Sequence, residues 1–169
     1  MSCRIRSGRV VTRYSNQYTQ SDCGPVAALN ILKWAGMKVT YKYHVRHIKE
    51  ECDYVHNEDF SGVRWWNLRS GLSRIGKGKI KVRKLEVRSL EDLQKHIAKG
   101  GAFILRFRAS PRDYHYTTVV PSDDGKDFVW VNPNDKLRTI TLHPEEFEKK
   151  IMSKQRFGDN LVALLISKI

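Results

Sequence analysis

The sequence predicts an α+β fold in which N-terminal helices pack on a C-terminal antiparallel sheet. Apolar residues recur at helical spacing in the first part of the chain, whereas β-branched and aromatic residues dominate short segments after Gly100-Gly101. Helices followed by a run of strands are typical of this class. The 169 residues, 40% of them apolar, suffice for the core of a single domain over residues 1–169.

The first half of the chain is expected to be mainly helical. A dense apolar pattern predicts a buried helix over Gly24–Gly36, with Pro25 in its first turn and Gly36 as its stop. The other predicted elements are helices near Lys42–Glu51, at Val63–Arg74 and from the capping Ser89 to Gly100, and strands at Arg9–Arg13 and Ile80–Val87.

The second half is expected to be mainly strands. They are predicted at Ala102–Arg108, His115–Val120, Asp127–Val131, Leu137–Leu142 and Asn160–Ile169. Asp123-Asp124-Gly125 is typical of a turn between two of these strands, and Pro144 starts a helix through Ile151.

Positive charge is concentrated in one part of the chain. There are 31 Lys and Arg against 18 Asp and Glu, a formal charge of +13, and residues 62–112 hold 14 of the basic residues but only three acidic ones. Lys79, Lys81 and Arg83 alternate with apolar residues, which predicts a strand with one cationic, solvated face. Such a strand is either a sheet edge protected from aggregation or a surface that attracts nucleic acid, acidic protein or anionic lipid.

No membrane partner or cofactor is expected. The longest apolar run, Leu161–Ile166, is far shorter than the roughly 20 residues of a spanning helix, and the N-terminus does not resemble a secretory signal. The three cysteines, Cys3, Cys23 and Cys52, favour free thiols in a reducing compartment. A metal site built from His44, His47, Cys52 and His56 is the less favoured alternative, because no second ligand pair at zinc spacing accompanies them.

The segment Gln17–Pro25 predicts a reactive thiol. Cys23 falls in the first turn of the apolar helix, where free backbone N–H groups and the helix dipole lower the pKa of a thiol. Gly24 keeps the space beside the sulfur open, and Gln17 or Gln20 could donate to an oxyanion together with the Cys23 N–H.

A cysteine nucleophile also needs a base and a group that orients the base. His115, at the start of a predicted strand, is the best candidate for the base. Asn132 follows the next predicted strand, and a hairpin that turns at Gly125 brings it nearly opposite His115. Asn134 and Asp135 are alternatives for the orienting group.

Together these residues resemble the C39-like branch of the papain-like cysteine peptidases. Gln17 and the run Asp22 to Leu29 match the pattern around the family nucleophile, and His115 to Val120 followed by Asn132-Pro133 match its downstream residues. The resemblance implies a papain-like fold with Cys23 as nucleophile, His115 as general base and Gln17 in the oxyanion hole. Asn132 would orient His115; family members usually have aspartate there, whereas papain itself has asparagine.

The resemblance also implies a peptide or protein substrate and a cytoplasmic location, in a bacterium or in the host of a phage. Candidate substrate-binding residues are Gly24, Trp65, Trp66 and Tyr114. The basic segment 62–112 could select acidic substrates or bind nucleic acid. Two other functions stay open: a catalytically idle module that binds nucleic acid or an acidic protein, and a thiol acyltransferase or deamidase on the same fold.

Overall fold

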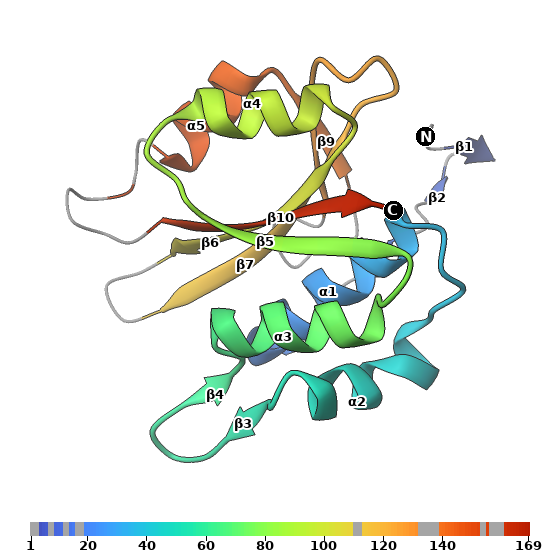
Figure 1. Ribbon diagram of the computed structural model, residues 1–169, viewed down its shortest axis with the longest axis vertical. Coiled ribbons are helices and arrows are strands. Elements are labelled where there is room, and N and C mark those ends of the chain that lie inside the picture. Colours follow the sequence, from blue (N-terminus) through green and yellow to red (C-terminus); the bar gives the residue numbers. More distant parts are fainter. Residues whose placement is uncertain are drawn as a thin grey trace.

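A six-stranded antiparallel sheet lies between two layers of helices (Figure 1). The computed structural model describes residues 4–6, 9–11, 14–15, 19–109, 113–131, 139–152, 155 and 161–169. The strand order is β5-β10-β6-β7-β8-β9. These strands are β5 (Ile80–Glu86), β6 (Ala102–Arg108), β7 (Tyr114–Pro121), β8 (Phe128–Val131), β9 (Thr139–Leu142) and β10 (Val162–Lys168).

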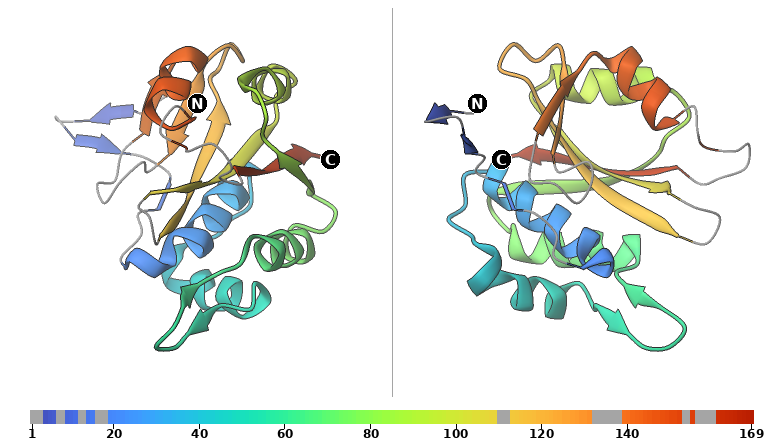
Figure 2. Two further views of the ribbon diagram at one scale, coloured as in Figure 1. Left: turned by 90° about the vertical axis from the view of Figure 1, so that its left-hand side faces the viewer. Right: turned by 180° about the vertical axis from the view of Figure 1, so that it is seen from behind.

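The helices divide between the two faces of the sheet. On one face lie α1 (Cys23–Trp34) and α3 (Trp65–Ile75), with α2 (Tyr41–Glu51) packed outside them. On the other face lie α4 (Leu90–Ala98) and α5 (Pro144–Lys150), as the two further views in Figure 2 show. This arrangement confirms the predicted α+β class with N-terminal helices packed on an antiparallel sheet.

Most predicted elements are present, and the differences concern very short ones. A 3-10 turn, η1 (Gln20–Asp22), leads directly into α1. The hairpins β1 (Arg4–Arg6) with β2 (Arg9–Val11) and β3 (Val55–His56) with β4 (Ser61–Gly62) were only partly predicted, because two- and three-residue strands have too little periodicity to detect.

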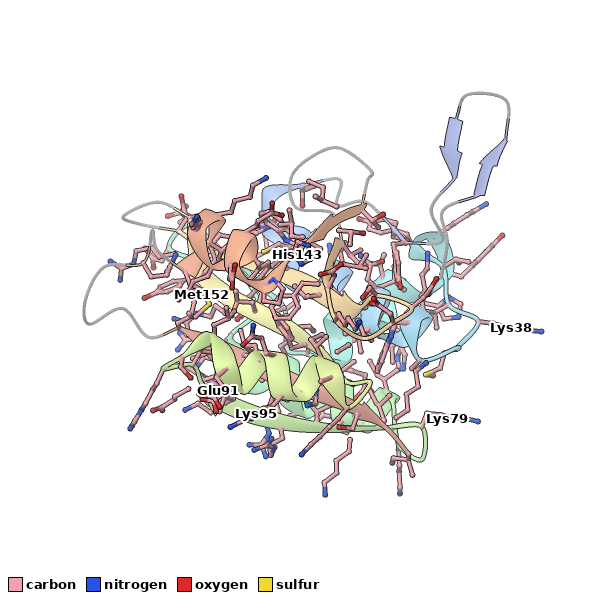
Figure 3. All side chains as sticks on the ribbon, turned by 90° about the horizontal axis from the view of Figure 1, so that it is seen from above. Lys38, Lys79, Glu91, Lys95, His143 and Met152 are labelled. Atoms are coloured by element: carbon pink, nitrogen blue, oxygen red, sulfur yellow. The ribbon has the colours of Figure 1, made fainter. Side chains whose placement is uncertain are left out.

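The predicted cationic strand, β5, forms one edge of the sheet and pairs with β10. Ile80 and Val82 are buried, whereas Lys81 and Arg83 are exposed, so the predicted alternation is confirmed. Basic side chains project outward from this edge in Figure 3, where Lys79 marks the beginning of β5. The edge position agrees with the interpretation that cations protect an unpaired strand from aggregation.

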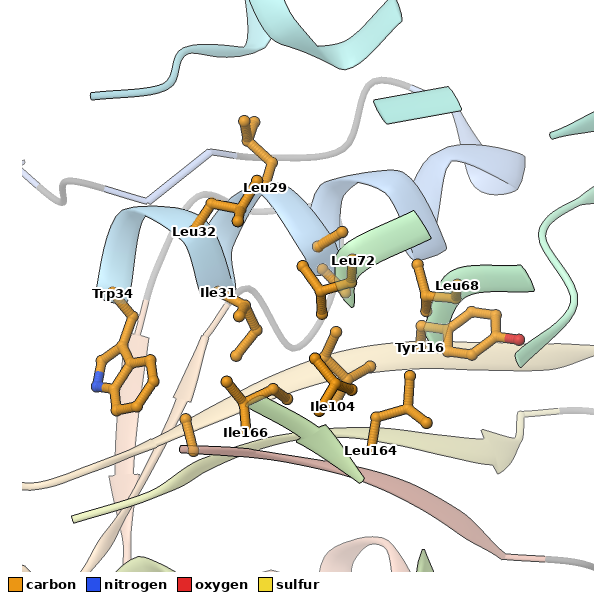
Figure 4. Packing of buried hydrophobic residues seen from close by; sticks show 14 of the residues in the cluster. Leu29, Ile31, Leu32, Trp34, Leu68, Leu72, Ile104, Tyr116, Leu164 and Ile166 are labelled. Carbon is orange, nitrogen blue, oxygen red and sulfur yellow. The ribbon is translucent and has the colours of Figure 1, made fainter. Parts of the chain in front are cut away.

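The core beneath α1 explains why this helix is apolar on nearly every side. Every residue of α1 except Lys33 is buried. Ile31 and Trp34 lie on the sheet side of α1, whereas Leu29 lies on its opposite side (Figure 4). Because α1 is enclosed between the sheet and the other two helices, its first residue, Cys23, has a fixed position.

The core on the other face holds α4 and α5 against the sheet. Phe147 of α5 contacts Phe103, Phe128 and Trp130 edge-on, with ring centroids 5.2 to 6.1 Å apart. Such aromatic contacts contribute about 0.5 to 1.5 kcal/mol each beyond area burial. Within the described residues, no helix is long and apolar enough to cross a membrane.

Candidate active site

Cys23 is the first residue of α1 and is 8% exposed. Tyr116 of β7, Gly24 and Cys23 itself direct backbone N–H groups to the sulfur, and these bonds lower the pKa of the thiol. Burial raises that pKa by more, and the carboxylate of Asp22 raises it further. The prediction that the helix end lowers the pKa therefore has the wrong net sign, because withdrawal from water opposes ionisation more strongly than three amides favour it.

Asp22 fixes the beginning of α1 by contacts with α2. Its carboxylate accepts a hydrogen bond from the Tyr41 hydroxyl at 2.7 Å and forms an ion pair with Lys49, also at 2.7 Å. The Asp22 side chain is 2% exposed, so both contacts are largely shielded from water. In the sequence, Asp22 stood out only as part of a motif, and its partners Tyr41 and Lys49 were not identified.

Tyr116 connects β7 to the loop before α3. Its hydroxyl donates to the Val63 carbonyl at 2.8 Å. A Cβ added at Gly24 would lie 3.3 Å from Val63 Cβ and 3.4 Å from Tyr116 Cδ2. Gly24, expected to keep space beside the sulfur open, thus permits close packing of Val63 and Tyr116 at this point.

His115 immediately precedes Tyr116 in β7. Its ring meets the ring of its cross-strand partner Phe107 edge-on, with centroids 5.5 Å apart. The side chains of Tyr116 and Thr118 face α1, where Thr118 Oγ1 donates to the Ala27 carbonyl at 3.1 Å. His115, the second residue of β7, therefore lies on the opposite face of the strand from Tyr116 and Thr118.

The backbone N–H of Tyr116 points toward the Cys23 sulfur. Cys23 and Tyr116 line one small hollow with Thr118 and Val131, and Cys23 belongs to the core on the α1 side of the sheet. The last described pair between β7 and β8 is Thr118 with Val131, two residues beyond Tyr116.

Two further candidate residues, Gln17 and Asn132, lie outside the described residues, as do Asn134 and Asp135. Asn132 follows Val131, which lines a small hollow with Cys23, Asn30 and Thr118. Gln20 is part of η1, although its side chain is not described. The roles predicted for all five residues stay predictions.

Asn30 is a positioning residue that the sequence did not indicate. Asn30 is 1% exposed and forms two hydrogen bonds with the backbone of Ser15. Its Oδ1 accepts from the Ser15 N–H at 2.8 Å, and its Nδ2 donates to the Ser15 carbonyl at 3.1 Å. Lys33 adds a 2.7 Å bond to the Ser15 hydroxyl. These contacts attach the segment that leads to Gln17 to the buried face of α1.

The candidate substrate-binding aromatics differ in exposure. Trp65 is half-buried at the beginning of α3 with Lys84 over its ring, whereas Trp66 is 46% exposed. Tyr114, at the beginning of β7, is 39% exposed.

The residues of the alternative metal site have local partners. His44 Nδ1 accepts from the Thr40 N–H at 2.9 Å, and His56 Nδ1 lies 2.8 Å from Ser61 Oγ. Cys52 is fully buried, which raises the pKa of its thiol to about 12. Among the residues that the structure describes, no group of three His, Cys, Asp or Glu could hold a metal ion.

Comparison with known proteins identifies the family of this chain. The family model of the peptidase C39-like family matches residues 11–156, most of the chain. The chain belongs to the peptidase C39-like family. No curated protein matches it.

Solved structures show which fold the C39-like chain shares. The peptidase domain of Streptococcus ComA, a bi-functional ABC transporter involved in a quorum-sensing pathway, is similar with a TM-score of 0.61 at 17% identity. The match covers 89% of this chain and 94% of that domain, and it identifies the papain-like fold. The Pseudomonas avirulence protein AvrPphB matches at 10% identity over 91% of this chain and 97% of that chain. Its TM-score of 0.41 is too low to infer a common fold.

Proposed function

We propose that this C39-like protein is a cysteine endopeptidase with Cys23 as its nucleophile. The observation that carries the proposal is that Tyr116, the residue after His115, lines one small hollow with Cys23 and packs against Gly24. Membership in a peptidase family supports a peptide or protein substrate. A reducing, cytoplasmic location suits a catalytic thiol.

In the proposed mechanism His115 takes the proton of the Cys23 thiol. The thiolate forms a C–S bond to the carbonyl carbon of the scissile amide, while the carbonyl oxygen accepts from the Cys23 N–H and the Gln17 amide. His115 returns the proton to the amine as the C–N bond breaks. Water, deprotonated by His115, then releases the acid from the thioester, and Asn132 orients the imidazole throughout.

The raised pKa of Cys23 makes the base essential. Burial alone keeps the thiol protonated at neutral pH, so a neighbouring imidazole must either remove the proton or stabilise the thiolate as an ion pair. This requirement distinguishes the proposal from a thiol activated by the helix alone.

Iodoacetamide alkylation across pH 5 to 10 tests the assignment. We expect wild-type Cys23 to react at neutral pH, whereas in His115→Ala the reaction should be confined to alkaline pH, because only burial, the amides and the charge of Asp22 then set the pKa. Peptide mapping by mass spectrometry identifies the labelled cysteine, and Cys52, whose pKa is about 12, serves as the unreactive internal control.

The proposal also requires turnover. Cys23→Ala and His115→Ala should each abolish cleavage of a peptide library, while Asn132→Ala should lower the rate and Asn132→Asp should retain it. Identical pH profiles for alkylation of wild type and His115→Ala would contradict the role of His115. Thioester capture by added amines, or conversion of glutamine to glutamate without chain cleavage, would instead favour acyl transfer or deamidation.

A second candidate function uses the cationic edge of β5. Lys79, Lys81 and Arg83 are exposed there, as expected for a surface that binds an acidic protein or nucleic acid. If the site is idle, binding of a labelled oligonucleotide should weaken steeply as salt rises. Binding that ignores salt would exclude this function.

A further inference from the structure

An exposed aromatic side chain with arginine partners lies at the beginning of β7. The guanidinium of Arg106 lies 3.8 Å from the ring centroid of Tyr114. Arg108 donates a hydrogen bond to the Tyr114 hydroxyl at 3.0 Å. The hydrogen bond from Arg108 is the largest cause of a lowered pKa of Tyr114, and the charge of Arg106 adds to it.

A second group of the same kind precedes α3. The Arg64 guanidinium lies 5.4 Å from the ring centroid of Trp66 and 5.8 Å from that of Phe60. Trp66 and Phe60 are 46% and 39% exposed, which are high values for large apolar side chains. Cation–π contacts hold each guanidinium on a ring while its N–H edge stays available to solvent.

The Arg106 and Arg64 groups both adjoin the contact between Tyr116, Val63 and Gly24. Tyr116, Val63 and Gly24 touch one another directly beside Cys23. Arg106 is the cross-strand partner of Tyr116, and Arg64 follows Val63 in the chain. The beginnings of β7 and α3 lie at the same end of the molecule in Figures 1 and 2.

Arg64 and Arg106 differ from several other cations of the described residues in what they contact. Across the residues that the structure describes, neither Arg64 nor Arg106 forms an ion pair with a carboxylate. Arg74, Lys84 and Lys95, by contrast, are each paired with a glutamate. A planar guanidinium held on a ring matches a carboxylate with two parallel hydrogen bonds.

We propose that Arg106 and Arg64 form a subsite that selects peptide substrates with Asp or Glu near the scissile bond. This inference rests on the proposed peptidase function and names its substrate class. Arg106 on Tyr114 is the principal element, and Arg64 on Trp66 is the second. Trp66 and Tyr114, predicted to contact substrate, would do so as supports for the two cations.

Binding to the Cys23→Ala protein separates this subsite from catalysis. The probes are a fluorescein-labelled dodecapeptide with three Glu residues and its Gln counterpart, followed by fluorescence anisotropy. We expect the Glu peptide to bind about tenfold more tightly, the usual effect of one charge-assisted pair. Arg106→Gln should remove most of that preference, and Arg106→Lys, which keeps the charge without the planar stack, should remove part of it.

Lys38→Gln and Lys126→Gln are matched controls, because each removes one exposed positive charge far from the beginnings of β7 and α3: Lys38 follows the end of α1, and Lys126 lies in the turn between β7 and β8. Each should change the preference less than twofold. Equal loss in these controls and in Arg106→Gln would overturn the subsite, since general electrostatics would then explain it. Full competition by a single-stranded oligonucleotide of equal charge would assign the surface to nucleic acid and would also overturn it.

Cleavage of a library with paired Glu and Gln peptides supplies the independent measurement. Cleavage by the wild type without preference for acidic residues overturns the subsite and leaves the peptidase intact. A Glu preference in binding without any cleavage overturns the peptidase and leaves the subsite intact. For Arg106→Gln we expect KM for acidic peptides to rise with little change in kcat, because the guanidinium binds substrate and takes no part in bond cleavage.

Discussion

Asp22 and Cys23 are neighbours whose side chains serve different purposes. The carboxylate of Asp22 turns away to Tyr41 and Lys49, while the sulfur of Cys23 turns to β7. The carboxylate nevertheless acts on the thiol through its charge, which raises the pKa of Cys23. Asp22 therefore stabilises the position of Cys23 at the expense of the ionisation of its thiol.

Substitutions at Asp22 should separate these two effects. Asp22→Ala should lower the free energy of unfolding by about 2 to 3 kcal/mol, since hydrogen bonds to charged groups contribute that much. Tyr41→Phe, which removes one of the two bonds, should cost about 1 kcal/mol. Urea unfolding measures both, and equal losses in the two variants would show that Lys49 contributes nothing.

Removal of the charge alone should have the opposite effect on reactivity. Asp22→Asn retains the size of the side chain but not the negative charge, so alkylation of Cys23 should begin at a lower pH than in the wild type. An unchanged or more alkaline profile would contradict the electrostatic role.

At the scale of elements, the helical layer depends on close contact between α2 and α3. A Cβ added at Gly71 of α3 would lie 2.6 Å from the Glu51 carbonyl oxygen and 2.5 Å from Cys52 Sγ at the end of α2. Arg74 and Glu51 form an ion pair across the same contact at 2.8 Å. The closeness of these helices determines where α2, and with it the anchor of Asp22, lies relative to α1.

Gly71→Ala should therefore destabilise the protein, although alanine favours helix formation. We expect a loss of about 1 to 3 kcal/mol in urea unfolding, the usual cost of overpacking against backbone. Ser70→Ala, on the exposed side of the same helix, is the matched control and should change stability by less than about 0.5 kcal/mol. A stabilising Gly71→Ala would mean that the two helices can separate without cost.

At the scale of the whole molecule, two hydrophobic cores lie on opposite faces of the sheet. The face with α1 carries Cys23 and its contacts, whereas the face with α4 and α5 holds a cluster of phenylalanines. Residues of β7 alternate between the cores: Tyr116 belongs to the first and Val119 to the second. The second core thus supports β7 from behind without touching the thiol.

Phe147→Ala tests this division. Loss of a fully buried phenylalanine should lower the free energy of unfolding by about 3 to 5 kcal/mol. Below the new melting temperature, the pH profile of Cys23 alkylation should match the wild type, because Phe147 lies across the sheet from the sulfur. A shifted profile in folded protein would show that the two cores are coupled through β7.

The sequence by itself predicted most of the elements and proposed the residues of the candidate site. Apolar periodicity predicted the buried α1, and β-branched runs predicted β6, β7 and β8, because these signals lie within one element. The order of residues around Cys23 and His115 indicated the family for the same reason. Roles for Gln17 and Asn132 also came from this order, and they stay predictions.

Tertiary structure alone decided which distant residues meet. It inserted the last strand, β10, between β5 and β6, and it brought the amide of Tyr116 to the Cys23 sulfur. It also raised the pKa of that thiol, whereas the sequence predicted a lowered pKa. The difference arises because neighbours from other elements bury the thiol. Contacts such as Asp22 with Lys49 and Arg106 with Tyr114 depend on packing and register, which no local pattern in the chain encodes.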